Sequence, residues 1–208
     1  NPHIYYTGRG SLEAANIGIE LKEEDVVFRC NFITVEDNIL RDYSAGHITT
    51  KESEMLIKEL NIQFKDRGVE FYLGTSYRNL MLVRGGKKLG LMDIKCTPPH
   101  DIVHQDLNKY LPEGENKEFL LNIMFESKKF LEAHQINKVR IDLQENPANM
   151  IWLWGQGTKP NMPTFTQKYG IEGAVISAVD LIKGIGKIIG LEVINVPGAT
   201  GYLSLIHI

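Results

Sequence analysis

Two arginines stand at glycine-containing turns, where a guanidinium group could bind an anion. Arg9 lies between Gly8 and Gly10, so the backbone could approach a ligand closely while the side chain forks onto phosphate. Arg78 follows the turn at 74–77, a loop position suited to recognising phosphate or carboxylate. The alternative for both residues is a solvated arginine at a tight turn. The chemistry that these positions favour is the binding of phosphate and carboxylate groups.

A third arginine interrupts an apolar run. Arg29 lies within segment 26–35, whose composition is typical of a strand, and an arginine in such a strand needs a partner or a cleft. The alternative is an edge-strand arginine that pairs with Asp42 or Glu36. Asn31 is expected on the same face as Arg29, because side chains alternate along a strand. The residues alone leave both interpretations of Arg29 open, and Asn31 shares whichever holds.

Three histidines lie in predicted loops. His47 precedes a helix that begins near Thr49, where its imidazole could donate to a phosphate held at the helix N-terminus; the alternative is a histidine that faces water. For His100 we expect a role facing the substrate, with Asp101 fixing its tautomer or capping a helix. A metal site formed by His100 and His104 is weakly supported, since no cysteine or placed carboxylate accompanies them.

The elements that must position these residues alternate between strands and helices. Thr49 and Glu52 form a capping-box pattern at the start of one helix, and Ser11 is a plausible N-cap of another. Gly85-Gly86 indicates a turn of the hairpin kind. We predict strands over 26–35, 69–73, 80–83, 152–157, 173–178 and 191–196, and helices over 11–15, from 49 onward, over 117–134 and over 179–189. The strand at 173–178 is expected to be buried, Trp152 and Trp154 to pack a core, and Gly184 and Gly186 to allow close helix packing. The inner face of the helix at 117–134 is expected to carry Phe119, Leu120, Ile123, Met124, Ser127, Phe130 and Leu131. This alternation predicts the α/β class.

Composition bounds the possible functions. The 208 residues are 43% hydrophobic and 24% charged, which is typical of a globular protein with a sizeable core. A formal net charge of −3 gives no electrostatic footprint for nucleic acid or for an anionic membrane. Cys30 and Cys96 are too few for a disulfide framework and are expected to be reduced thiols. Together with the lack of a long apolar run, this predicts a cytoplasmic protein with no membrane or nucleic-acid partner.

The two ends of the sequence suggest an internal segment of a longer protein. The chain starts at Asn1 without a methionine and ends in the apolar run 202–208. We expect residues 204–208 to be a non-native tail, because they resemble translated adaptor sequence.

Several strings, in one order, resemble those of a known family. They are 5–10, 28–31, 42–48, 97–101, 151–157 and 173–186, of which the last two are long and low in degeneracy. The chain resembles the archaeal-type 2,3-bisphosphoglycerate-independent phosphoglycerate mutases, which are alkaline phosphatase-like metalloenzymes. The resemblance covers residues 1–203 and ends where the tail begins.

The resemblance implies an inserted α/β substrate-binding domain over 26–160. Pieces of an alkaline phosphatase-like core would flank it at 1–25 and 161–203. It also implies two divalent metal ions, Mn²⁺ or Mg²⁺ with Zn²⁺ or Co²⁺ as further options. The serine nucleophile would lie upstream of Asn1 and the metal ligands outside the segment, so no catalytic or metal-binding residue is expected within it.

The resemblance carries a substrate-binding role over to seven residues. These are Arg9, Arg29, Asn31, His47, Arg78, His100 and Asp101. The implied reaction interconverts 2- and 3-phosphoglycerate through a phosphoserine, and the segment alone is expected to be inactive. Two alternatives stay open: a non-catalytic module that binds a phosphorylated ligand, and a related enzyme that acts on another phosphate. The sequence does not predict the oligomeric state.

Overall fold

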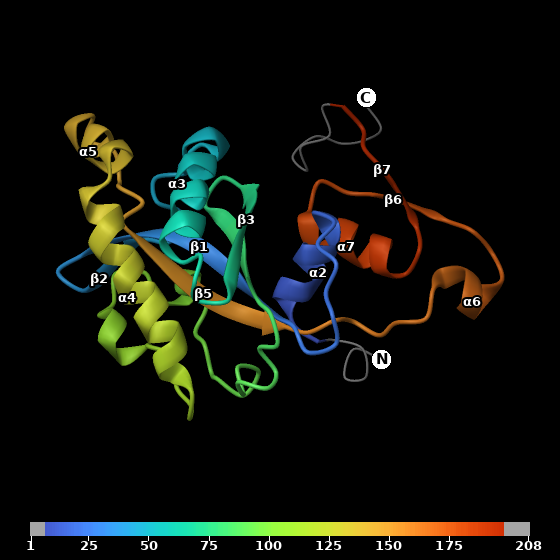
Figure 1. The fold of residues 1–208 in the computed structure, drawn as a ribbon. Helices are drawn as coiled ribbons and strands as arrows, with labels where there is room; N and C mark the ends of the chain where they lie inside the picture. The colour runs from blue at the N-terminus through green and yellow to red at the C-terminus, as the bar shows by residue number, and fades with distance from the viewer. Residues whose placement is uncertain (1–6, 198–208) are drawn as a thin grey trace.

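A computed structural model describes residues 7–197, and its largest element is a five-stranded antiparallel sheet (Figure 1). Its strands are β1 (Val26–Glu36), β2 (Ile39–Asp42), β3 (Val69–Thr75), β4 (Arg78–Val83) and β5 (Met150–Gly157). β1 pairs with β4 and β5, β3 lies beyond β4, and β2 pairs with the last residues of β1. Strands and helices together confirm the mixed α/β class.

Two long helices cover one face of this sheet (Figure 1). They are α3 (Thr50–Gln63) and α4 (Lys117–Ala133), and α5 (Gln135–Asp142) follows α4. The predicted capping box is confirmed, because the Thr49 side chain accepts from Glu52 N while the Glu52 side chain accepts from Thr49 N. The inner face predicted for α4 is buried at Leu120, Ile123, Met124, Ser127 and Leu131. Its apolar side chains join the main hydrophobic core.

The opposite face of β1 looks toward helix α2 (Arg9–Asn16). Val27 packs there in a small apolar cluster with Ala14, Leu80 and Leu82. Because side chains alternate along a strand, Arg29 follows Val27 on this face. The site residues of β1 therefore lie beyond the edge of that apolar cluster rather than in the main core.

α2 also packs against α7 (Asp180–Ile188), near the C-terminal end of the described chain (Figure 1). The same part of the chain contains α6 (Phe165–Tyr169) and the strands β6 (Ala174–Ile176) and β7 (Glu192–Ile194), which pair in parallel. A Cβ at Gly184 would lie 1.8 Å from the carbonyl oxygen of Leu12. The glycines of α7 thus serve close helix packing, as the sequence predicts.

Three local expectations are wrong. The N-cap of α2 is Gly8, while Ser11 lies inside the helix and donates to Gly8 O at 2.9 Å. Gly85-Gly86 forms a turn but no hairpin, because the chain continues into the two short 3-10 helices Pro99–Asp101 and Leu107–Lys109. The strand β6 is not buried, and Ile176 is exposed.

Other expectations are not decided by the fold. The domain boundaries at 25/26 and 160/161 stay predictions, and the tail 204–208 lies outside the described residues. Between residues 7 and 197, no helix combines the length and apolar character that crossing a membrane requires.

Candidate functional site

The centre of the candidate site is a carboxylate shared by two arginines. Glu13, on α2, accepts a hydrogen bond from Arg9 Nε to its Oε1 at 3.0 Å. Its second oxygen, Oε2, lies 3.1 Å from Arg29 Nε, at ion-pair distance but without hydrogen-bond alignment. Arg9 is one turn before Glu13 on the helix, whereas Arg29 comes from β1. The packing of α2 on the sheet therefore brings the two guanidinium groups together.

The indole of Trp154 lies beneath both guanidinium groups. The Cζ atoms of Arg29 and Arg9 are 4.6 Å and 5.4 Å from a ring centroid of Trp154, which is cation–π distance. Trp154 Nε1 donates to Asn31 Oδ1 at 3.1 Å, and the His100 ring packs edge-on with a centroid separation of 5.2 Å. Strand pairing explains the stacking, because Trp154 is the partner of Arg29 across β1 and β5.

The electrostatics of this cluster favour an anion. The side chain of Arg29 is only 3% exposed, and burial lowers its pKa to about 10. The nearby charge of Glu13 opposes this change, while the positive charges of Arg9 and Arg78 add to it. Two arginines thus share the half-buried Glu13 carboxylate, with the charge of Arg78 nearby, and a bound anion would relieve the repulsion among the three.

A row of aromatic rings connects Arg78 to the histidines. The Arg78 Cζ atom lies 5.6 Å from the ring centroid of Tyr77, and the His47 ring lies 6.2 Å from the same centroid. The Tyr43 ring packs edge-on against both Tyr77 and His100, with ring centroids 5.7 Å and 6.4 Å apart, respectively. Since His100 also contacts Trp154, the row joins the exposed residues Arg78 and His47 to the buried Arg29 and the partly exposed Arg9.

The loop that carries His47 has an unusual backbone that other residues hold in place. Ala45 and His47 adopt positive φ angles of 49° and 51°, which non-glycine residues rarely adopt. Arg140 donates to Ala45 O at 2.9 Å, and the Asp42 carboxylate accepts from Ser44 N at 2.7 Å. Burial alone would raise the pKa of Asp42, but hydrogen bonds from its neighbours outweigh burial and hold it below the ordinary value. The loop is thus fixed in the conformation that presents His47.

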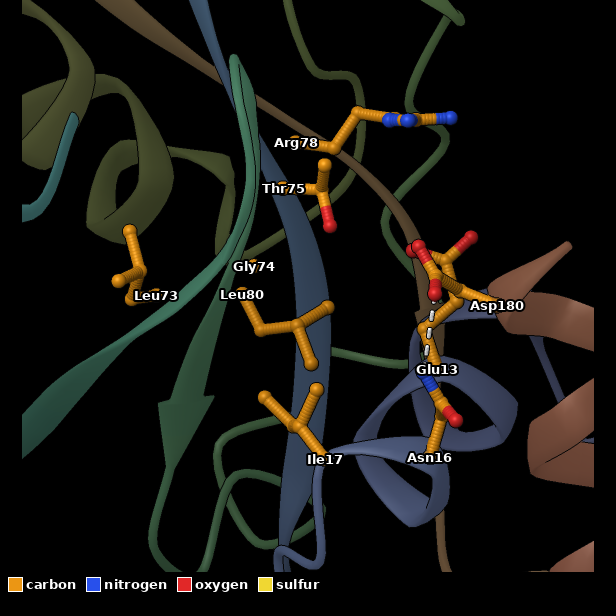
Figure 2. A pocket seen from close by; sticks show the side chains of 9 residues that line it. All are labelled: Glu13, Asn16, Ile17, Leu73, Gly74, Thr75, Arg78, Leu80 and Asp180. Carbon is orange, nitrogen blue, oxygen red and sulfur yellow. Dashed lines mark hydrogen bonds between the residues drawn. The ribbon is translucent and has the colours of Figure 1, made fainter. Parts of the chain in front are cut away.

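A pocket of about 130 Å³ adjoins the cluster (Figure 2). Glu13 and Arg78 line it together with Asp180, at the start of α7, whose Oδ1 accepts from Asn16 Nδ2 at 3.1 Å. Figure 2 shows the Arg78 side chain extending over the side of the pocket where the two carboxylates lie. The pocket therefore reaches from the sheet to both α2 and α7.

The structure brings six of the seven predicted site residues into one connected group. These are Arg9, Arg29, Asn31, His47, Arg78 and His100, and their binding role stays a prediction. Asp101 lies only at the edge of this group: its side chain is 60% exposed, and its Oδ1 lies 3.7 Å from His100 Nε2. That separation is too long for a hydrogen bond, so Asp101 does not fix the tautomer of His100.

Two of the alternative interpretations are also decided. Arg29 pairs with Glu13 rather than with Asp42 or Glu36. The glycines beside Arg9 serve packing, because a Cβ at Gly8 would lie 1.8 Å from Gln156 O. These glycines let the start of α2 approach β5 closely, whereas the sequence predicts that they let the backbone approach a ligand.

Glu13 and Trp154 are site residues that the sequence did not reveal. Glu13 follows Arg9 at i+4 spacing on a helix, a signal that was available but common. Tryptophans at alternate strand positions usually pack a core, as Trp152 does with its Nε1 bonded to Thr97 O. Only the tertiary structure shows that Trp154 stacks on arginines.

The residues described here do not form a metal centre. Between residues 7 and 197, no group of three or more His, Cys, Asp or Glu side chains could hold a metal ion. The buried thiol of Cys30 and the partly buried thiol of Cys96 both have a pKa raised by burial, that of Cys96 to about 12. Neither cysteine is suited to metal binding or nucleophilic chemistry at neutral pH.

Comparison with known proteins identifies the same family that the sequence strings resemble. The family model for 2,3-bisphosphoglycerate-independent phosphoglycerate mutase matches residues 1–137. A protein of that name from Methanosarcina mazei is 50% identical over 204 residues, which are 98% of this chain and 51% of that protein. A probable member from Geobacter sulfurreducens is 44% identical over 208 residues, again covering 98% of this chain and 51% of the relative.

A solved structure supports the same relationship. The cofactor-independent phosphoglycerate mutase of Thermoplasma acidophilum superposes with a TM-score of 0.64 at 26% identity, covering 95% of this chain and 54% of that one. The chain spans about half the length of the curated relatives it matches. From the family match and these identities, the chain belongs to the 2,3-bisphosphoglycerate-independent phosphoglycerate mutase family.

Proposed function

We propose that the full-length protein, meaning this chain with the remaining length that its relatives have, interconverts 2- and 3-phosphoglycerate without 2,3-bisphosphoglycerate. The observation that carries the proposal for this chain is the group of three arginines around Glu13 and Trp154. Such a group matches a ligand that carries several negative charges on one small molecule.

The charges of the ligand and of the site are complementary. A phosphate monoester carries about 1.5 to 2 negative charges at neutral pH, and the carboxylate of phosphoglycerate adds another. Arg9, Arg29 and Arg78 supply three positive charges, of which Glu13 offsets one. A single exposed ion pair contributes only about 0.2–1 kcal/mol, so affinity needs several arginines in a partly desolvated pocket. Arg29, which is almost fully buried, meets that condition best.

The residues of this chain would bind and orient the substrate rather than transfer the phosphoryl group. The planar guanidinium groups suit phosphate and carboxylate oxygens, and His47 and His100 add ring nitrogens at the edge of the site. We propose that the serine nucleophile and the ligands of two divalent metal ions, Mn²⁺ or Mg²⁺, come from outside residues 7–197. When bound, such ions stabilise the negative charge of a phosphoryl group in transfer.

An activity assay tests this proposal. We expect the purified full-length protein to interconvert 2- and 3-phosphoglycerate with no added 2,3-bisphosphoglycerate and to lose activity in a chelator, with recovery on adding Mn²⁺ or Mg²⁺. Activity that depends on the bisphosphate and survives chelation would contradict the proposal. Binding of 3-phosphoglycerate without turnover would favour a non-catalytic module instead, and turnover of another phosphate ester would favour a different substrate.

A further inference from the structure

We propose that Glu13 and Trp154 are positioning residues that hold Arg9 and Arg29 side by side, ready to bind the substrate. The inference rests on the proposed function, since it concerns the same site. It adds a role for two residues that are not themselves expected to contact the substrate. Their contacts with the arginines, the buried setting and the charge balance each support it.

The shared carboxylate determines which nitrogens of the arginines remain available. Arg9 Nε donates to one oxygen of Glu13 at 3.0 Å, and Arg29 Nε lies 3.1 Å from the other oxygen as an ion pair without hydrogen-bond alignment. Within residues 7–197, the Nη groups of neither arginine donate a hydrogen bond to the protein. A guanidinium group has five N–H donors, of which the Nη groups hold four. Glu13 therefore orients both groups while leaving most of their donors for a ligand.

Trp154 fixes the planes of the two guanidinium groups. Both lie over its rings, and the indole is itself anchored by the hydrogen bond from its Nε1 to Asn31 Oδ1. The indole is only 5% exposed, so it cannot turn away without disturbing its neighbours. Fixing the arginines in advance lowers the entropy that is lost when a ligand binds.

The arginine pair could not keep this geometry without its negative partner. Two guanidinium groups on one indole repel each other, and burial strengthens the repulsion around Arg29. A carboxylate accepts on both sides, whereas a glutamine would offer one acceptor and one donor. In Glu13→Gln, the amide NH₂ would face the Nε–H of one arginine, so that arginine would move away.

Two sets of variants in the full-length protein, each with a matched control, test the positioning role. Glu13→Gln is compared with Glu36→Gln, whose carboxylate pairs with Arg41 on the surface. Trp154→Phe and Trp154→Leu are compared with Trp152→Phe, a buried tryptophan of the same strand that is bonded to Thr97 O. For each variant we would measure the KM and kcat for 3-phosphoglycerate, the calorimetric Kd for the same ligand, and the urea midpoint of unfolding.

We expect Glu13→Gln and Trp154→Leu to raise the KM and the Kd about tenfold or more, with a smaller effect on kcat. Trp154→Phe keeps an aromatic ring under the arginines and should rescue most of the affinity, while both control variants should leave KM and Kd unchanged. If Glu13→Gln or Trp154→Leu shifts only the urea midpoint, or if Trp154→Leu binds as well as Trp154→Phe, the positioning role is wrong. A protein that lacks mutase activity but whose Kd follows this order would contradict the proposed function and support the positioning role.

Discussion

Replacing Arg29 by alanine in the full-length protein should lower kcat/KM for 3-phosphoglycerate about 100-fold or more, the largest effect expected of any residue in this chain. Arg29 is the most deeply buried arginine of the cluster, and it contacts both Glu13 and Trp154. Truncating one partner of a buried charge pair costs about 2–5 kcal/mol. The measurement is steady-state kinetics in both directions without 2,3-bisphosphoglycerate.

Arg29→Lys and Arg41→Ala complete this experiment. The lysine variant keeps the charge but loses the planar fork and the stacking, so we expect about a tenfold loss or more. Arg41→Ala removes an exposed arginine on β2, whose one ion pair within residues 7–197 is with Glu36, and should leave kinetics unchanged. Full activity in Arg29→Ala would show that this arginine does not serve the substrate.

Replacing Arg78 by alanine should lower kcat/KM about tenfold or more, equivalent to about 1.4 kcal/mol or more. The effect is smaller than for Arg29 because Arg78 is exposed and solvent screens its charge. It is still substantial, because Arg78 lines the pocket with Glu13 and contacts Tyr77.

Lys87→Ala is the control for Arg78→Ala, since Lys87 is an exposed cation beyond the same strand. It should change kcat/KM by less than about twofold, as expected for a surface charge remote from the site. Equal losses in the two variants would indicate a general effect of surface charge, and no loss in either would remove Arg78 from the site.

Two local patterns in the sequence predicted local structure correctly, whereas the N-cap at Ser11 and the hairpin at Gly85-Gly86 were wrong. The capping box at Thr49 and Glu52 and the periodicity of 117–134 depend on residues close in the chain, and both are confirmed. The pairing order of the sheet was not predicted, because antiparallel β1, β4 and β5 are joined by long connections. The exposure of β6 was missed because its apolar residues are typical of a buried strand.

The candidate site, like the sheet, depends on contacts between residues far apart in the chain, and these contacts were not predicted. Arg29 could be singled out because a charge in an apolar strand needs a partner, but its partner lies on a helix that only tertiary packing brings near. Trp154 was expected to pack a core because its sequence setting matches that of Trp152. Asp101 was included by the family string, yet its side chain is mostly exposed and is too far from His100 for a hydrogen bond. The types of residue were enough to name candidate site residues, but the contacts among those residues could be seen only in the folded structure.

A crystal structure of the full-length protein with 3-phosphoglycerate bound tests the central claim most directly. The prediction is that phosphate or carboxylate oxygens of the ligand lie within hydrogen-bond distance, about 2.7–3.2 Å, of guanidinium nitrogens of Arg29 and Arg78. Glu13 and Trp154 should keep the contacts with Arg9 and Arg29 that they have without ligand. A substrate bound to the full-length protein with none of Arg9, Arg29 and Arg78 within that distance would contradict the assignment of the site.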